Sequence, residues 1–157
     1  MKSKQVENYL GQEGILSFNL EGFEFRRQQM DMAVAVEEAF GRANHLIVEA
    51  GTGTGKSLAY LIPAILWAVA NNKKVVISTY TKTLQHQILN YDIPFLRDKL
   101  GIEFRYALCM GNENYLSLRR LKRSAQAGLF THSDEESQWE GVFNWAGETE
   151  TGYRSDL

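Results

Sequence analysis

The chain has 157 residues, which is enough for one compact domain. Apolar residues make up 44% of it and charged residues 23%, and the net charge of -2 neither requires nor excludes a local nucleic-acid surface. The single cysteine, Cys109, excludes an internal disulfide and any four-cysteine metal or iron–sulfur site made by this chain alone.

Three helical regions are expected in the first hundred residues. Arg26–Gly41 carries apolar residues at helical spacing and ends at a glycine. Lys56–Asn71 has Pro63 in its interior, which should bend the helix. Thr83–Leu100 should be broken near Pro94. The apolar run inside the second helix is too short to span a bilayer, and the polar N-terminus has no signal segment, so we expect a cytoplasmic protein without membrane contact.

Three short apolar runs have the character of strands: His45–Ala50, Lys74–Thr79 and Phe104–Cys109. The first two are β-branched and nearly unbroken, the pattern of strands that are buried on both faces of a parallel sheet. Strands that alternate with helices predict an α/β fold, with a parallel β-sheet flanked by helices.

The composition changes after residue 111. Asn114–Ala127 reads as a basic helix that includes Arg119–Arg123, Asp134–Glu140 is acidic, and Gly147–Leu157 reads as loop. We therefore expect residues 1–111 to form most of an α/β unit and residues 112–157 to begin an insertion that the chain does not complete.

A phosphate-binding loop stands between the first predicted strand and the second helix. Its glycines allow the backbone to form an anion cradle, and the helix that follows adds its positive end. Lysine should reach the β- and γ-phosphates of a nucleotide, and the serine hydroxyl should ligate Mg²⁺. The predicted nucleotide-binding residues are Ala50, Gly51, Thr52, Gly53, Thr54, Gly55, Lys56 and Ser57.

With the sequence Leu-Ala-Tyr-Leu-Ile-Pro-Ala after it, this loop closely resembles motif I of superfamily 2 DNA helicases, and most of all that of the DinG group, bacterial relatives of the XPD iron–sulfur helicases. The resemblance spans nearly the whole chain, but it covers just the opening part of a helicase. It implies a RecA-like P-loop domain that binds ATP and Mg²⁺.

Phe-Arg-Arg-Gln-Gln, upstream of the loop, resembles the family's Q motif, in which an arginine and a glutamine recognise adenine. Gln29 offers a donor and an acceptor side by side, which matches an adenine edge, and Arg26 has the chemistry to stack on the base or to hold Gln29. The alternative is a solvated first turn of a helix.

The segment that follows the second predicted strand resembles motif Ia, where the family contacts the phosphates of single-stranded DNA. Thr79 and Thr81 can donate to phosphate, and Lys82 adds positive charge. Ordinary helix capping by the hydroxyls is the alternative. The basic residues 119–123 form a second possible contact with single strands, or else a solvated helix face.

Iron–sulfur members of the family carry a cysteine where this chain has Ser117, and a serine is a poor cluster ligand. We therefore do not expect this chain to hold an iron–sulfur cluster. Cys109, at the end of a predicted strand, is expected to be a small buried apolar group.

The family's Asp-Glu-x-His box and its second RecA-like domain are missing from this sequence. We therefore expect an ATP-binding fragment of an ATP-dependent helicase that acts on single-stranded DNA, inactive without its C-terminal helicase domains. Two alternatives stay open: a truncated helicase module that binds DNA or protein without catalysis, and another P-loop NTPase or kinase.

Overall fold

The structure is a computed structural model that describes the backbone of residues 5–127 and 133–157. Its contacts divide the chain into two units, Met1–Tyr106 and Ala107–Leu157. Within the described residues no helix is both long and apolar enough to cross a membrane. The first unit carries the predicted phosphate loop, so its packing decides how the loop is held.

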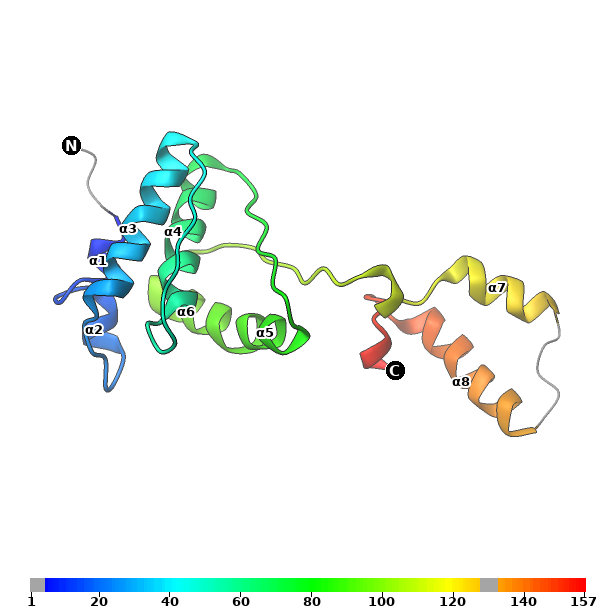
Figure 1. Cartoon of the computed structure of the whole chain (residues 1–157). Coiled ribbons are helices and arrows are strands. Elements are labelled where there is room, and N and C mark those ends of the chain that lie inside the picture. Colours follow the sequence, from blue (N-terminus) through cyan, green and yellow to red (C-terminus); the bar gives the residue numbers. More distant parts are fainter. Residues whose placement is uncertain (1–4, 128–132) are drawn as a thin grey trace. The chain divides into compact units, whose positions relative to one another are not determined.

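The predicted parallel sheet does not form in the described part of the chain. Residues 44–51, 73–79 and 101–111 run as drawn-out chain without strand pairing (Figure 1). A strand is held by the backbone of a neighbour, and none of these segments has one. The apolar side chains expected to be buried on both faces are instead open to solvent: Ile47 is 98% exposed and Val76 is 90% exposed.

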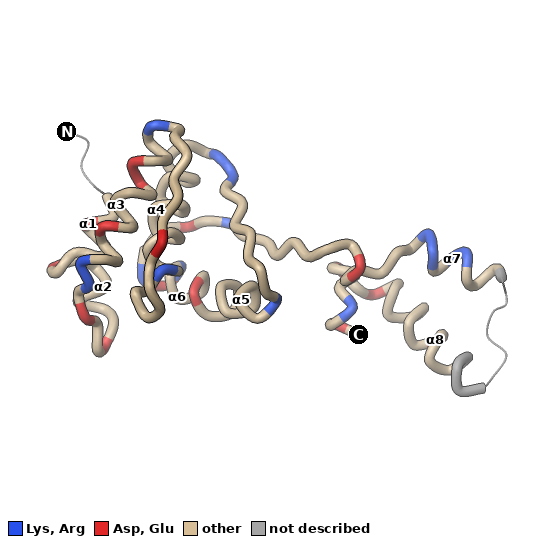
Figure 2. Tube along the Cα trace, viewed as in Figure 1, with Lys and Arg blue, Asp and Glu red and all other residues tan. Residues whose placement is uncertain are grey.

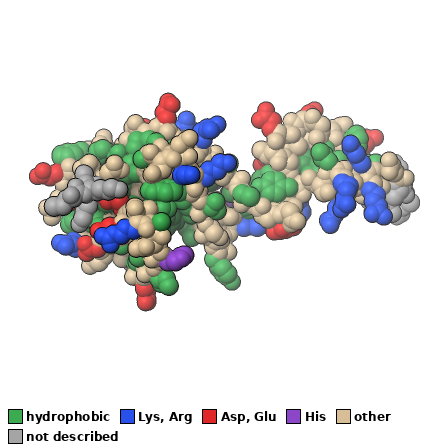
Figure 3. All heavy atoms as spheres, turned by 90° about the horizontal axis from the view of Figure 1, so that it is seen from above, with side chains coloured by type: hydrophobic (Ala, Val, Ile, Leu, Met, Phe, Trp, Pro, Cys, Tyr) green, Lys and Arg blue, Asp and Glu red, His purple; other side chains and the backbone are tan. Residues whose placement is uncertain are grey.

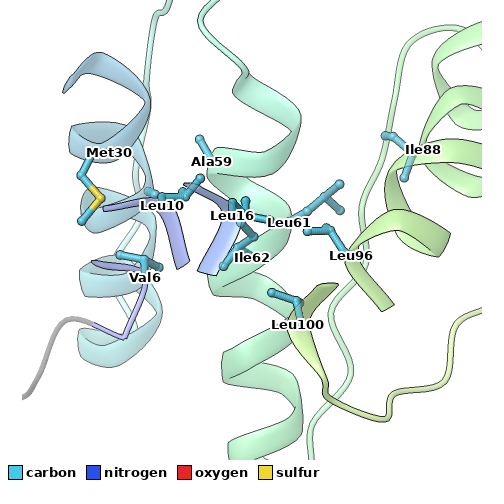
Figure 4. Packing of buried hydrophobic residues seen from close by; sticks show 11 residues of the cluster. Val6, Leu10, Leu16, Met30, Ala59, Leu61, Ile62, Ile88, Leu96 and Leu100 are labelled. Atoms are coloured by element: carbon cyan, nitrogen blue, oxygen red, sulfur yellow. The ribbon is translucent and has the colours of Figure 1, made fainter. Parts of the chain in front are cut away.

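Two short helices at the N-terminus, α1 (Glu7–Leu10) and α2 (Ile15–Asn19), were not expected from the sequence. Each has about one turn and lacks a side-chain cap, so its local signal is weak. These two helices contribute to the hydrophobic core because their few apolar residues are buried. Val6, Leu10 and Leu16 form one side of the hydrophobic core (Figure 4).

The two long helices are α3 (Arg27–Arg42) and α4 (Lys56–Asn71), which pack against each other. The range of α4 confirms the prediction, with Pro63 inside it and buried. The end of α3 is shifted, because the left-handed residue that stops it is Ala43 rather than Gly41. Leu61 and Ile62 of α4 fill the centre of the core (Figure 4), and burial of each such side chain stabilises the fold by about 1.5–3 kcal/mol.

The third helical region runs on without the predicted break. It consists of α5 (Lys82–Gln87), a π-helical turn η1 (Ile88–Asp92) and α6 (Ile93–Leu100). Pro94 lies in the first turn of α6, where its missing N–H is least costly. The wider π turn before it takes up the mismatch that a proline creates in an α-helix, so the chain changes helix type where a break was expected.

The second unit contains a short 3-10 turn η2 (Asn112–Asn114), then α7 (Leu118–Ala127), α8 (Ser133–Glu148) and a final 3-10 turn η3 (Arg154–Asp156). The basic and acidic segments thus both lie in helices, although the side chains of residues 134–136 are outside the described set. The end of the chain is more ordered than a loop. Leu116 N donates to Gly152 O at 2.8 Å, and Tyr115 and Tyr153 form an isolated antiparallel bridge.

Candidate nucleotide-binding site

The phosphate loop forms a tight turn that ends in the first residue position of α4. Gly53 (φ 77°) and Gly55 (φ 75°) both adopt the left-handed conformation that glycine tolerates best. Gly55 is the N-cap of α4, and no side chain caps that end of the helix. The first amides of a 16-residue helix are therefore uncapped beside the loop, which is an arrangement that favours anions.

Lys56 lies across the loop rather than pointing away from it. Its Nζ donates to the carbonyl oxygens of Gly51 at 2.6 Å and Ala50 at 3.1 Å. Thr54 Oγ1 also donates to Gly51 O, at 3.0 Å. The lysine ammonium is thus already in the loop where the motif predicts that phosphates bind.

Both predicted adenine-reading residues touch the loop. Arg26 Nη1 donates to Gly53 O at 2.7 Å, and Gln29 Nε2 donates to Gly55 O at 2.9 Å. Gln29 is buried, so it is not a solvated side chain of a first helical turn. The two side chains, from the N-cap and the first turn of α3, thus bond to the carbonyls of the two left-handed glycines.

Ser57 sits in a polar cluster that the sequence analysis missed. Ser57 and Tyr60 belong to α4, whereas Gln87 is the last residue of α5 and Asp92 the last residue of η1. Burial raises the pKa of the Asp92 carboxyl, while its hydrogen bonds with Ser57 and Gln87 oppose that rise. Burial also raises the pKa of the Tyr60 hydroxyl; its hydrogen bond with Ser57 opposes the change, and the charge of Asp92 adds to it. No motif in the sequence marks Asp92.

The predicted DNA-contacting residues lie at the start of α5. Thr81 caps this helix, because its Oγ1 accepts a hydrogen bond from Leu84 N at 3.2 Å. Thr79 Oγ1 donates to the Thr81 carbonyl at 3.2 Å. Lys82 is the first residue of α5 and is exposed. The hydroxyl of Thr81 therefore has an ordinary capping role, which was the alternative reading of the motif.

In the second unit, Ser117 caps α7 by accepting a hydrogen bond from Arg120 N at 3.4 Å. Cys109 is exposed, so the expectation that it is a buried apolar group was wrong. Cys109 lies within residues 101–111, which pair with no strand among the described residues. No group of three histidine, cysteine, aspartate or glutamate side chains suited to a metal occurs among the described residues.

Basic residues recur along α7 (Figure 2), and lysine and arginine side chains gather on the surface of the second unit (Figure 3). Tyr115, whose ring could stack on a base, already has partners within the second unit. Its ring lies 5.9 Å from that of Tyr153 between centroids, and its hydroxyl accepts a hydrogen bond from Met110 N at 3.0 Å.

Comparison with known proteins identifies the family of the chain. Residues 28–139 match the DEAD/DEAH box helicase family. The chain is 38% identical to the ATP-dependent DNA helicase YoaA of Haemophilus influenzae, over 94% of this chain and 22% of that protein. It is 41% identical to the ATP-dependent helicase DinG of Mycobacterium tuberculosis, over 84% and 22% of the two chains. It is 34% identical to the 3'-5' exonuclease DinG of Bacillus subtilis, over 99% and 17%.

No solved structure matches the chain. The chain spans about a fifth of the length of the curated relatives named above. The family match includes the whole phosphate loop and the start of α5, and it extends into α8. These matches confirm the resemblance drawn from the sequence motifs: the chain belongs to the DEAD/DEAH box helicase family.

Proposed function

We propose that this chain is the ATP-binding opening part of a RecA-like domain in an ATP-dependent helicase that acts on single-stranded DNA. The observation that carries the proposal is the phosphate loop itself. Its glycine carbonyls are held by Arg26 and Gln29, and it leads into α4 with Lys56 and Ser57 in the first helical turn. Membership of a helicase family supports a nucleoside triphosphate as the ligand.

The residues suit ATP and Mg²⁺. Lys56 supplies a positive charge, and the loop and first-turn amides supply donors for phosphate oxygens. Mg²⁺ prefers oxygen ligands, and both the Ser57 hydroxyl and a buried, unpartnered oxygen of Asp92 lie in one cluster. When bound, Mg²⁺ neutralises negative charge on the phosphates.

Gln29 gives a physical reason for a preference for adenine. Its Nε2 is committed to Gly55 O, which leaves Oε1 as the acceptor available to a base. An adenine amino group can donate to that oxygen, whereas guanine presents a second acceptor there. Arg26 holds the loop through a second hydrogen bond, to Gly53 O.

The remaining parts of the proposal concern a longer protein. We infer that residues 45–50, 74–79 and 104–109 become strands of a parallel sheet when further strands pair with them. Residues 1–111 then belong to the RecA-like domain, and residues 112–157 begin an insertion without an iron–sulfur cluster. Thr79, Thr81 and Lys82 contact the DNA backbone in a cytoplasmic enzyme. The chain alone lacks the carboxylate box and arginines for hydrolysis, so it binds ATP without efficient turnover.

Calorimetric titration with ATP and GTP, each with Mg²⁺, tests the proposal. We expect ATP to bind more tightly than GTP, and Lys56→Ala to weaken ATP binding about tenfold or more, because a charged hydrogen-bond donor to phosphate is lost. Lys73→Ala is the matched control, since it removes an exposed lysine just beyond the other end of α4. It should bind ATP as the unaltered chain does.

Other outcomes separate the alternatives. Equal binding of ATP and GTP would remove the adenine role of Gln29 and favour a general P-loop NTPase. Transfer of phosphate to a small acceptor would favour a kinase. Binding of neither nucleotide, together with ATP-independent binding of DNA, would favour a non-enzymatic module, for which the basic helix α7 is the supporting observation.

A further inference from the structure

Helix α7 carries a concentration of positive charge that the described carboxylates do not neutralise. The helix has no acidic residue of its own. Its four basic side chains are all exposed, and none of them forms an ion pair with a carboxylate among the described residues. The four residues, here called the basic face, are Arg119, Arg120, Lys122 and Arg123.

Helical spacing places the basic face on one side of α7. With 3.6 residues per turn, its four members cover an arc of about 160°. Leu121 lies at the back of that arc and is buried, with 7% of its surface exposed. The helix therefore presents an apolar side to the second unit and the basic face to solvent.

Helix α8 lies against the apolar side of α7 within the same unit. Ala125 of α7 and the rings of Trp139 and Phe143 of α8 line one pocket. Glu140 of α8 also lines this pocket, and it forms no ion pair with the basic face. The packing of α7 on α8 thus uses the side of the helix that does not carry the positive charges.

This arrangement of charges is unfavourable for a helix without a bound anion. Arg119 and Arg123 are one turn apart, and like charges at that spacing repel each other. Arg119 and Arg120 also lie in the first turn, where the helix dipole is positive and where α7 has no acidic residue. A polyanion that binds along the basic face would offset both effects.

The start of α7 is anchored within the second unit. Leu116 N donates to Gly152 O at 2.8 Å, and Tyr115 pairs with Tyr153 in an antiparallel bridge. These contacts fix the segment that leads into α7. They also hold the ring of Tyr115 against that of Tyr153, 5.9 Å away between centroids, so the basic face offers charge without this aromatic platform.

Two kinds of anionic polymer or surface could meet the basic face, and the observations favour nucleic acid. A helix that lies on a membrane inserts its apolar side between lipids, whereas Leu121 on that side of α7 is buried, and Leu118 is the large apolar side chain of α7 that is exposed. The chain belongs to the DEAD/DEAH box helicase family, and relatives in that family are named as DNA helicases.

We propose that the basic face of α7 binds the phosphate backbone of single-stranded DNA through charge, without nucleotide and without base preference. It is a second contact, in addition to the one proposed at the start of α5. The inference rests on the proposed function in taking a single strand as the partner. Each phosphate that a cation neutralises on a single strand releases counterions, so the contact has a defined dependence on salt.

The test measures binding of a labelled oligothymidylate to the 157-residue chain by fluorescence anisotropy, without nucleotide and over a range of salt concentrations. The variant is Arg119→Gln with Arg123→Gln, because glutamine favours helices about as well as arginine does. Loss of two phosphate contacts should reduce the slope of log K against log salt concentration by about 1.4. The affinity ratio between the unaltered chain and the variant should then shrink about sevenfold from 50 to 200 mM salt.

Three comparisons make the result specific to charge on α7. Arg97→Gln with Arg105→Gln removes two exposed arginines from the first unit and should leave the slope unchanged. Arg119→Lys with Arg123→Lys keeps both charges and should restore the affinity and the slope. The loss caused by the glutamine variant should be the same factor on oligoadenylate as on oligothymidylate, because phosphates carry no base identity.

Unchanged affinity and slope in the glutamine variant, equal losses in the first-unit variant, or failure of the lysine variant to restore binding would each overturn the role of α7. The proposed function would stand if Lys82→Gln still weakened binding. Attachment to anionic vesicles in place of the oligonucleotide would assign the basic face to a membrane and overturn the inference. An unaltered chain that binds ATP but no oligonucleotide would overturn both proposed DNA contacts and leave the ATP site.

Discussion

Gly53 and Gly55 have the same left-handed backbone conformation but different surroundings. A Cβ atom at Gly55 would collide with the side-chain amide of Gln29, whereas one at Gly53 would meet nothing within 4 Å. Alanine at either position suffers the conformational strain. At Gly55 it also pushes Gln29 away from the carbonyl that it holds, so the two positions separate strain from contact.

We expect Gly53→Ala to lower the free energy of unfolding by about 1 kcal/mol, the cost of a left-handed alanine. Gly55→Ala should cost about 1 kcal/mol more, because it also breaks the hydrogen bond from Gln29. Urea unfolding followed by circular dichroism measures both values. Equal losses for the two variants would show that the contact between Gln29 and the loop does not contribute to stability.

At the residue scale, motifs within short segments could be predicted from the sequence, whereas contacts between distant segments could not. The loop motif and the Arg26–Gln29 pair belong to short segments, and the structure brings these segments together. Asp92 carries no motif, and its approach to Ser57 depends on a π turn and on how two helices pack. No short sequence pattern predicts the π turn or the packing of the two helices, so the approach of Asp92 to Ser57 could not be predicted.

At the scale of elements, helix α5 begins with a residue that has two possible roles. Thr81 Oγ1 accepts from Leu84 N, and capping hydroxyls of this kind typically contribute about 1 kcal/mol. We expect Thr81→Ala to lower the free energy of unfolding by about that amount. Thr83→Ala, at an exposed position inside the same first turn, is the control and should cost less.

Urea unfolding and binding of a labelled single-stranded oligonucleotide together separate the two roles of Thr81. A loss of stability without loss of DNA affinity would assign capping alone. Loss of DNA affinity beyond that of Thr83→Ala would support the proposed phosphate contact as well. No loss of stability would contradict the cap that the structure shows.

Helices were predicted better than strands because their bonds are local. Helix α4 has the predicted range, since its apolar run, its glycine start and its asparagine end all lie within one segment. The expected break at Pro94 became a π turn, because the chain on both sides is packed and continues helical. Strand pairing depends on residues far apart in sequence, and the described chain provides no partner for the three predicted segments.

At the scale of the whole chain, two drawn-out apolar segments in the first unit are left uncovered. Leu46 and Val48 are about two-fifths exposed, and Ile47 and Val76 are almost fully exposed. Unpaired backbone next to exposed β-branched side chains is a template for pairing with another chain. In the longer protein that we propose, added strands cover these segments, but the isolated chain has no such cover.

The isolated 157-residue chain should therefore self-associate as its concentration rises. A lysine at the centre of either segment, Ile47→Lys or Val76→Lys, should reduce the association, because a charged side chain disfavours edge pairing. Phe18→Lys is the matched control, since Phe18 is 77% exposed but lies in α2, away from both segments in sequence. Sedimentation velocity over a range of concentrations measures the effect. A monomer at every concentration would contradict the predicted self-association. Equal relief by all three variants would mean that general hydrophobicity, rather than open strand edges, drives the association.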